Sequence, residues 1–260
     1  MTLPAGVGAL RLLSPPPHSS RRVRIPARRG PLAAVTDPAP RPLRRAVFLD
    51  RDGTLIHDPG YLAEPEGVVL FPTVPDALRA LDEHGFDLVV CTNQSGISRG
   101  KYTVAQYQRV ASRLEDLLAA EGLRLRATYY CPYHPEGTVP PWNADHEDRK
   151  PAPGMWHRAA REHGLDLATS YTIGDGERDV VAGKRAGTTS ILLAAGRDKW
   201  PLPVGGDLDA DFTARDLREA VVWILQREGA SLPSRPGASL SRAARPAASS
   251  PSLLPGPSPS

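Results

Sequence analysis

The chain has 260 residues, of which 40% are hydrophobic and 23% are charged, with a formal net charge of +3. These values are typical of a globular protein with one domain of ordinary size. No apolar run approaches the ~18 residues that a membrane-spanning helix needs. The two cysteines, Cys91 and Cys131, provide no disulfide framework, so we expect a cytoplasmic protein.

Proline and arginine are concentrated in the two terminal segments, residues 1–44 and 229–260. These segments are mixtures of Pro, Ala, Ser and Arg without sustained periodicity. They cannot bury enough apolar surface to offset the entropy of ordering, so we predict that both are disordered. We interpret their positive charge as that of solvated appendages rather than of nucleic-acid contacts. Prolines interrupt the N-terminal segment, which argues against a transit peptide; an alternative is a start site assigned too far upstream.

Between these segments, residues 45–228 alternate short apolar runs with helix-type stretches. The runs predict strands at 46–50, 86–92, 127–131, 171–175 and 190–194. Helical spacing of apolar residues predicts helices at 73–85, 103–122 and 154–164, and another from about residue 177. Thr73 is the expected cap of the first helix, and Thr103 with Gln106 forms a capping box for the second. This order predicts one α/β domain, a Rossmann-like doubly wound, mostly parallel sheet with helices on both faces.

Polar residues gather where these strands end. They are Asp50 and Asp52, Thr92 to Ser95, Arg149 and Lys150, and Asp175 to Asp179. In a parallel sheet, ligands bind beyond the carboxyl ends of the strands, so we expect these groups to meet at one edge.

The residue types at that edge indicate phosphate chemistry. Three carboxylates, Asp50, Asp52 and Asp175, would repel one another unless a cation lay among them, and hard oxygen ligands favour Mg²⁺. Lys150 and Thr92 can neutralise and bind phosphate oxygens. An ionised aspartate beside a phosphoryl group can act as a nucleophile and form an aspartyl phosphate. The sequence has no GxxxxGK[ST] phosphate-binding loop, which argues against a nucleotide kinase.

Four motifs carry a family resemblance. "FLDRDGTL", "CTNQSGISRGKYT", "DRKPAPGM" and "IGDGERDVVAGKRAG" resemble, in order, the motifs of the haloacid dehalogenase superfamily of phosphohydrolases. The segments "DPGY", "TNQSGISRG", "YYCPYHPEG" and "RKPAPGM" resemble more closely the D,D-heptose 1,7-bisphosphate phosphatase and histidinol-phosphatase branch. The resemblance covers about residues 45–200.

The resemblance implies a role for each catalytic residue. Asp50 would be the nucleophile, and Asp52 would protonate the leaving oxygen and later deprotonate the attacking water. The carboxylates of Asp50 and Asp175 and the backbone carbonyl of Asp52 would bind Mg²⁺. Thr92 and Lys150 would hold the transferred phosphoryl group. The remaining residue, Asp179, would orient Lys150 or a metal-bound water.

Substrate contacts are also implied, from the loops around this centre. The family contacts sugar and remote phosphate through positions equivalent to Asp58, Gly60, Tyr61, Asn93, Gln94, Ser95 and Arg149. An alternative for Arg149 is a surface ion pair with Glu147 or Asp148. The short stretch between the first two motifs leaves no room for a large cap domain.

The chain departs from this branch in two places. The branch carries a zinc loop, for which this chain offers only a degenerate set: Cys131, His134, His146 and Asp148. Tyr133 stands where a histidine belongs, so we do not expect bound zinc, and we expect "VPPW", with a buried Trp142, to stiffen the loop instead. Gly176 stands where many relatives have a basic residue, so a distal phosphate contact is expected to be missing.

The predicted function is therefore a Mg²⁺-dependent phosphomonoesterase acting on a small phosphosugar, with D-glycero-D-manno-heptose 1,7-bisphosphate as the first candidate. Histidinol phosphate is the alternative within the same scaffold. A polynucleotide 3′-phosphatase is disfavoured because the domain has no basic, aromatic-interleaved groove signature. A non-catalytic phosphosugar-binding protein is disfavoured because all four motif anchors are present. We expect a monomer without nucleic-acid or membrane partners.

Overall fold

The computed structural model describes residues 42–194 and 210–230. The disorder predicted for residues 1–44 and 229–260 therefore lies largely outside the described residues. The regular elements run from Ala46 to Arg227, inside the predicted 45–228 range. Arg44 is already ordered, because its N–H donates to the carbonyl of Gly164 at 2.9 Å. In the described part of the chain, no helix has the length and apolar character needed to span a membrane.

A parallel sheet forms the centre of the domain, as predicted, and it has six strands. Its strands are β1 (Ala46–Leu49), β2 (Asp87–Asn93), β3 (Ala127–Cys131), β4 (Tyr171–Gly174), β5 (Thr189–Leu193) and β6 (Phe212–Ala214). The spatial order is β3-β2-β1-β4-β5-β6. The chain thus winds outward from β1 in one direction and then, from β4, in the other. Ligands bind at such a reversal of strand order.

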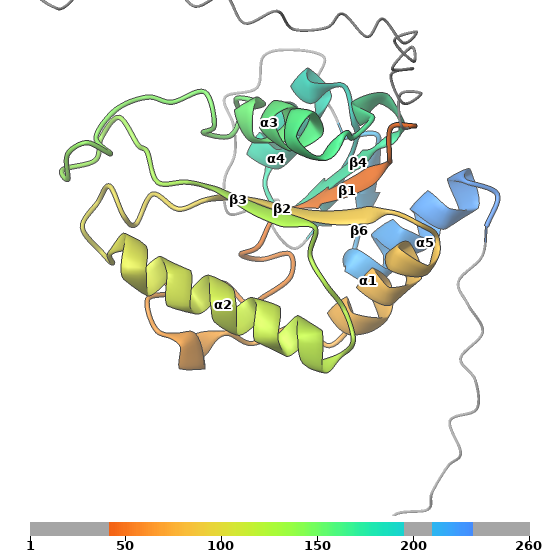
Figure 1. Ribbon diagram of the computed structural model, residues 1–260, viewed down its shortest axis with the longest axis horizontal. Helices are drawn as coiled ribbons and strands as arrows, with labels where there is room; N and C mark the ends of the chain where they lie inside the picture. Colours follow the sequence, from red (N-terminus) through yellow and green to blue (C-terminus); the bar gives the residue numbers. More distant parts are fainter. Residues whose placement is uncertain (1–41, 195–209, 231–260) are drawn as a thin grey trace, which may run out of the picture. The chain divides into compact units, whose positions relative to one another are not determined.

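Helices cover both faces of the sheet (Figure 1). They are α1 (Val74–Glu83), α2 (Val104–Ala120), α3 (Gly154–His163), α4 (Glu177–Ala186) and α5 (Leu217–Arg227), with short 3-10 turns η1 (Pro65–Gly67) and η2 (Leu167–Thr169). In Figure 1, α3 and α4 lie above the sheet, and α1, α2 and α5 lie below it. The connection from β1 to β2 holds only η1 and α1, so no large cap domain is inserted there.

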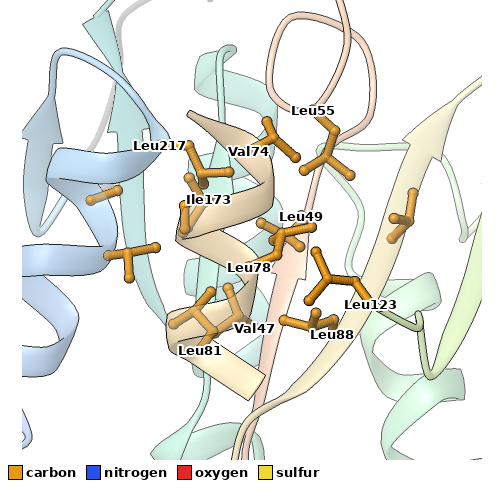
Figure 2. Packing of buried hydrophobic residues seen from close by; sticks show 14 of the residues in the cluster. Val47, Leu49, Leu55, Val74, Leu78, Leu81, Leu88, Leu123, Ile173 and Leu217 are labelled. Atoms are coloured by element: carbon orange, nitrogen blue, oxygen red, sulfur yellow. The ribbon is translucent and has the colours of Figure 1, made fainter. Parts of the chain in front are cut away.

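Alternating residues of β1 supply the two halves of the core. Val47 and Leu49 face α1, whose Val74, Leu78 and Leu81 point toward them (Figure 2). The residue between them, Phe48, packs on the other face against Trp156 of α3, with ring centroids 5.8 Å apart. A strand buried on both faces reads as a continuous apolar run, which is why "AVFL" was recognisable.

Three details differ from the sequence expectation. Strand β6 and helix α5 follow the last predicted element and were not anticipated. Thr73 does precede α1, but its side chain makes no capping hydrogen bond, because its own backbone is already helical. By contrast, the capping box of Thr103 and Gln106 forms as expected at the start of α2.

Candidate active site

The carboxyl ends of β1 and β4 bring the central aspartates together. These two strands are neighbours in the sheet, with Leu49 in register with Ile173. Asp50 directly follows β1, and Asp175 directly follows β4. Two residues that are far apart in the sequence are therefore placed side by side at the reversal of strand order.

A buried cluster of charges lies at this point. Carboxylate oxygens of Asp50, Asp175 and Asp179 lie within 4.8 Å of one another. Lys150 is buried among them, with Nζ 2.8 Å from Oδ1 of Asp50 and 2.5 Å from Oδ1 of Asp179. It also donates to the carbonyl of Cys91 at 2.9 Å. Each of the three donor directions of the ammonium group thus has a protein acceptor.

The charges of this cluster do not balance. Burial, together with the nearby carboxylates of Asp50 and Asp179, raises the pKa of Asp175 to about 7. Burial alone would lower the pKa of Lys150, but the carboxylates of Asp179 and Asp50 reverse this and raise it. Three carboxylates surround one ammonium group, and an excess of negative formal charge remains even when the positive charge of Arg178, which also acts on Asp175 and Asp179, is counted. Oδ1 of Asp175 is also buried without a hydrogen-bond partner among the described residues. This donor set fits a small, hard divalent cation.

Gly53 allows the first motif to approach Asp175. Its φ is +80°, a left-handed conformation that residues with a Cβ rarely adopt. A Cβ at this position would lie 2.0 Å from Oδ2 of Asp175. The glycine of "DRDGT" is therefore required by both the backbone conformation and the space available.

Asp52, in the same loop, is hydrogen-bonded to Arg51, Gln94 and Thr92. Oδ1 accepts hydrogen bonds from Arg51, with Nη2 at 2.9 Å and Nε at 3.1 Å. Oδ2 accepts from Nε2 of Gln94 at 2.8 Å and from the hydroxyl of Thr92 at 3.4 Å. Burial raises the pKa of Asp52, while the charge of Arg51 counteracts this. The raised pKa suits a group that must carry a proton before giving it up.

Two of the expected substrate-contacting residues instead hold other site residues. The side chain of Asn93 donates to the carbonyl of Lys150 and accepts from its N–H, both at 3.1 Å. Gln94 is buried and bonds Thr92 as well as Asp52. In this structure their amide groups tie the end of β2 to the Lys150 loop and to Asp52.

A rim of more exposed residues surrounds the centre. Asp58 accepts a hydrogen bond from the N–H of Gly60 at 2.8 Å, which shapes the loop that carries Tyr61. The exposed Tyr61 ring lies 6.5 Å from the ring of Tyr102, and Nζ of Lys101 lies 5.8 Å from its centroid. The "DPGY" loop and the segment after "TNQSGIS" therefore meet in space.

Arg149 points into the loop that follows β3 rather than to an acidic neighbour. Its Nη1 donates to the carbonyl of Tyr133 at 3.1 Å. Asp148, one of the alternative partners expected for it, pairs instead with Arg158 at 2.6 Å. Burial lowers the pKa of Arg149, and the positive charges of Arg178 and Arg99 lower it further. The positive charges that act on Arg149 make this region suited to an anion.

The degenerate zinc set does not assemble. His146 stacks on the ring of Tyr133, with centroids 4.2 Å apart and planes 10° apart, and Tyr133 also meets Trp142 edge-on. Nη2 of Arg99 donates to Nε2 of His134 at 2.9 Å, a contact that requires a neutral imidazole acceptor. Among the described residues, the group placed to hold a metal ion is the aspartate cluster. Trp142 is half-buried, not buried as expected.

Comparisons with known proteins agree with this geometry. The chain is 39% identical to the D-glycero-beta-D-manno-heptose-1,7-bisphosphate 7-phosphatase of Yersinia pestis over 175 residues, which cover 67% of this chain and 92% of the relative. The chain belongs to the haloacid dehalogenase superfamily of phosphatases. A family model described as HAD-hydrolase-like matches residues 148–220. Within the superfamily the chain falls in the heptose bisphosphate phosphatase branch, as its motifs predicted, and it is a phosphoric monoester hydrolase.

Other members of the superfamily extend the comparison. The D-glycero-alpha-D-manno-heptose-1,7-bisphosphate 7-phosphatase of Burkholderia mallei is 38% identical over 154 residues, which cover 59% of this chain and 82% of the relative. The crystal structure of D,D-heptose 1,7-bisphosphate phosphatase from B. bronchiseptica, complexed with magnesium and phosphate, superposes with a TM-score of 0.60 at 28% identity, covering 70% of this chain and 99% of the other. A HAD-like phosphatase structure from Mesorhizobium loti gives 0.61 at 34% identity, covering 70% and 87%.

Sequence reasoning missed Arg51 and Tyr102, both buried beside the predicted catalytic groups. Arg51 stands between the two aspartates of "DRD". An arginine at the end of a strand can equally well face solvent, so its position did not predict that it is buried. Tyr102 follows the second motif and reads as an ordinary apolar residue ahead of a helix. Only the fold shows that Arg51 bonds Asp52 and that Tyr102 bonds Gln94.

Proposed function

We propose that this phosphatase removes the 7-phosphate of D-glycero-D-manno-heptose 1,7-bisphosphate with the help of Mg²⁺. The buried cluster of Asp50, Lys150, Asp175 and Asp179 carries the proposal, because it places a nucleophile beside a cation and an unbalanced negative charge. The substrate follows from the relatives, whose names specify heptose 1,7-bisphosphate with a beta or an alpha anomer.

The metal would be held by the carboxylates of Asp50 and Asp175 and the backbone carbonyl of Asp52. The structural support is the buried, unpaired Oδ1 of Asp175 and the charge imbalance of the cluster. When bound, Mg²⁺ would supply charge stabilisation to phosphate oxygens. Asp179 keeps its carboxylate on Lys150, so we assign it to positioning rather than to the metal. We propose no role for zinc.

In the first step, Asp50 attacks phosphorus and the P–O bond to the sugar breaks. Oδ1 of Asp50 accepts from Lys150 and from the N–H of Arg51, both at 2.8 Å, so we propose that Oδ2 forms the new bond. The proton of the Asp52 carboxyl passes to the departing sugar oxygen. The result is an acyl phosphate on Asp50 and a neutral sugar hydroxyl.

In the second step, the Asp52 carboxylate takes a proton from a water molecule that attacks phosphorus. The bond between phosphorus and Asp50 breaks, which releases inorganic phosphate and regenerates both carboxyl groups. Throughout, we propose that Lys150 and the hydroxyl of Thr92 hold the phosphoryl oxygens. Fixed donors of this kind stabilise charge without having to reorganise during the reaction.

For the substrate, we propose that the sugar and its remaining phosphate contact the rim. Tyr61 lies near Tyr102, whose hydroxyl bonds Gln94, a hydrogen-bond partner of Asp52. Arg149 would bind the distal phosphate in a region that Arg178 and Arg99 make more positive. Arg178 lies two positions after Gly176 and can offset the missing basic residue there. Ser95 completes the proposed contacts.

The test is phosphate release by the full chain with Mg²⁺, using both heptose bisphosphate anomers, histidinol phosphate and a 3′-phosphorylated oligonucleotide. A preference of about 100-fold for one heptose anomer, ~2.7 kcal/mol of transition-state discrimination, would support the assignment. Better turnover of histidinol phosphate would overturn the heptose substrate but not the assignment of the protein as a phosphatase.

Asp50→Asn should abolish turnover while leaving substrate binding measurable by calorimetry. Asp76→Asn, at a solvent-exposed ion pair with Arg79, is the matched control and should retain activity. We further propose a cytoplasmic monomer without nucleic-acid or membrane partners; light scattering of the purified chain checks the monomer.

A further inference from the structure

Arg51 is a buried arginine that the proposed reaction leaves without a role. It is 2% exposed, although it lies between two aspartates at the end of β1. An ionised guanidinium group is expensive to desolvate unless its hydrogen bonds are satisfied. The cost of burying this charge must therefore be offset, either by a gain in stability or by a role in function.

Two of its five N–H donors are directed at Asp52, while Nη1 is buried without a hydrogen-bond partner among the described residues. Nε and Nη2 both donate to Oδ1 of that carboxylate, at 3.1 and 2.9 Å, and Nε lies 3.2 Å from Oδ2. Nη2 also reaches Oε1 of Gln94 at 3.2 Å, and the guanidinium carbon lies 5.4 Å from the ring centroid of Tyr107. This cation–π contact favours one orientation of the planar guanidinium group.

Gln94 holds the other oxygen of Asp52, and Tyr102 fixes the orientation of Gln94. The amide Nε2 donates to Oδ2 of Asp52 at 2.8 Å, while Oε1 accepts from the hydroxyl of Tyr102 at 2.6 Å. Because that hydroxyl donates to Oε1, the amide must present its NH₂ to Asp52. The Tyr102 ring is closely packed, since a Cβ on Gly96 would lie 2.2 Å from it.

We propose that Arg51 is the positioning residue of this enzyme's general acid, acting together with the Tyr102–Gln94 pair to fix the Asp52 carboxylate in one orientation. This inference rests on the proposed role of Asp52 as the proton donor to the leaving oxygen. Neither Arg51 nor Tyr102 touches the phosphoryl group; both act through Asp52. The reaction itself is unchanged: the proton of Asp52 moves to the leaving oxygen as the P–O bond breaks.

A positioning role has a consequence that a purely structural role lacks. A sugar alkoxide leaves only with a proton, whereas p-nitrophenolate is stable enough to leave without one. Misorientation of Asp52 should therefore slow phosphoryl transfer from a sugar phosphate far more than from p-nitrophenyl phosphate. Simple damage to the site should slow both by the same factor. General acid catalysis is worth ~10²–10⁴-fold, so the difference is large enough to measure.

The experiment compares single-turnover release of the leaving group from the sugar phosphate and from p-nitrophenyl phosphate by the full chain with Mg²⁺. Arg51→Met should lose about 100-fold on the sugar phosphate and less than about 10-fold in the p-nitrophenolate burst, with KM little changed. Arg51→Lys should recover part of the loss, because charge is kept while the forked geometry is lost. Arg79→Met, at an exposed ion pair, is the matched control.

Tyr102→Phe provides a second test in case the Arg51 variants do not fold. It removes one hydroxyl and should reproduce the same selective loss on a smaller scale, about 3- to 10-fold. Tyr129→Phe, which removes a buried tyrosine hydroxyl bonded to Glu162 at 2.6 Å, should show no selectivity. Equal losses on both substrates for Arg51→Met, or for Tyr102→Phe, would overturn the inference. If the wild-type chain hydrolysed neither substrate, the proposed function itself would fail instead.

Discussion

Lys150 and Asp50 form a fully buried ion pair, with Nζ 2.8 Å from Oδ1, at the centre of a cluster that also contains Asp175 and Asp179. The lysine is in direct contact with two of these three carboxylates, Asp50 and Asp179. It therefore has to offset their mutual repulsion in the protein without metal, besides any part it takes in binding phosphate.

Replacing Lys150 with methionine should destabilise the metal-free protein by about 3–5 kcal/mol, because buried carboxylates lose their counter-charge. Added Mg²⁺ should recover part of this loss, since a cation among the carboxylates relieves the repulsion. Urea unfolding with and without Mg²⁺ measures both effects. Lys184→Met, at a partly exposed pair with Asp211, should cost less than about 1 kcal/mol. Equal costs for the two variants would show that the buried cluster does not depend on its lysine.

Gly53→Ala should disrupt the centre through Asp175. The added Cβ would lie 2.0 Å from Oδ2 of that residue, so the carboxylate must move. We expect kcat to fall by about 100-fold, in line with the loss caused by ~1 Å misplacement of a catalytic group. Gly85→Ala is the matched control, because its φ of +78° imposes the same backbone strain with nothing within 4 Å of the new Cβ. If both variants lost activity equally, backbone strain alone would explain the effect.

The sheet and the meeting of the aspartates could be predicted because both follow from local patterns. Each buried strand reads as an apolar run, and parallel pairing then places Asp50 and Asp175 at one edge. Strand β6 could not be predicted, since three residues are too few for a period and its partner β5 precedes it by a long connection. Pairing with β5 at the edge of the sheet, rather than the pattern of its own residues, makes this segment a strand.

Side-chain pairing at the site was less predictable than strand placement. The family resemblance implied that Asp179 orients Lys150 or a metal-bound water, and the structure has the contact with Lys150. It did not reveal that Asn93 would bond the Lys150 backbone or that His146 would stack on Tyr133. Those contacts depend on how two long loops fold back, which no periodicity encodes.

Magnesium binding should depend on pH through Asp175. Its raised pKa of about 7 means that the metal-free folded protein holds a proton that the unfolded chain loses at lower pH. The contribution of Asp175 to the free energy of unfolding of the metal-free protein is therefore fully present at low pH and is lost as the pH rises through 7. Because Mg²⁺ must displace that proton, its apparent affinity should be about tenfold higher at pH 8 than at pH 6. Calorimetric titration at both pH values, with Asp175→Asn as the control, tests this; equal affinities would contradict it.

The loop after β3 should keep its structure without zinc. Stacking of His146 on Tyr133, the edge contact of Tyr133 with Trp142, and the pairing of Asp148 with Arg158 supply contacts that a metal would otherwise provide. A zinc-selective chelator should therefore leave both the melting temperature and the Mg²⁺-supported activity unchanged. Tyr133→Ala should instead raise KM for the preferred substrate several-fold, because it removes the ring from a stack worth about 0.5–1.5 kcal/mol per aromatic pair and loosens the carbonyl that accepts from Arg149. Loss of activity on chelation, restored by zinc, would show that the loop binds the metal through another arrangement of its side chains.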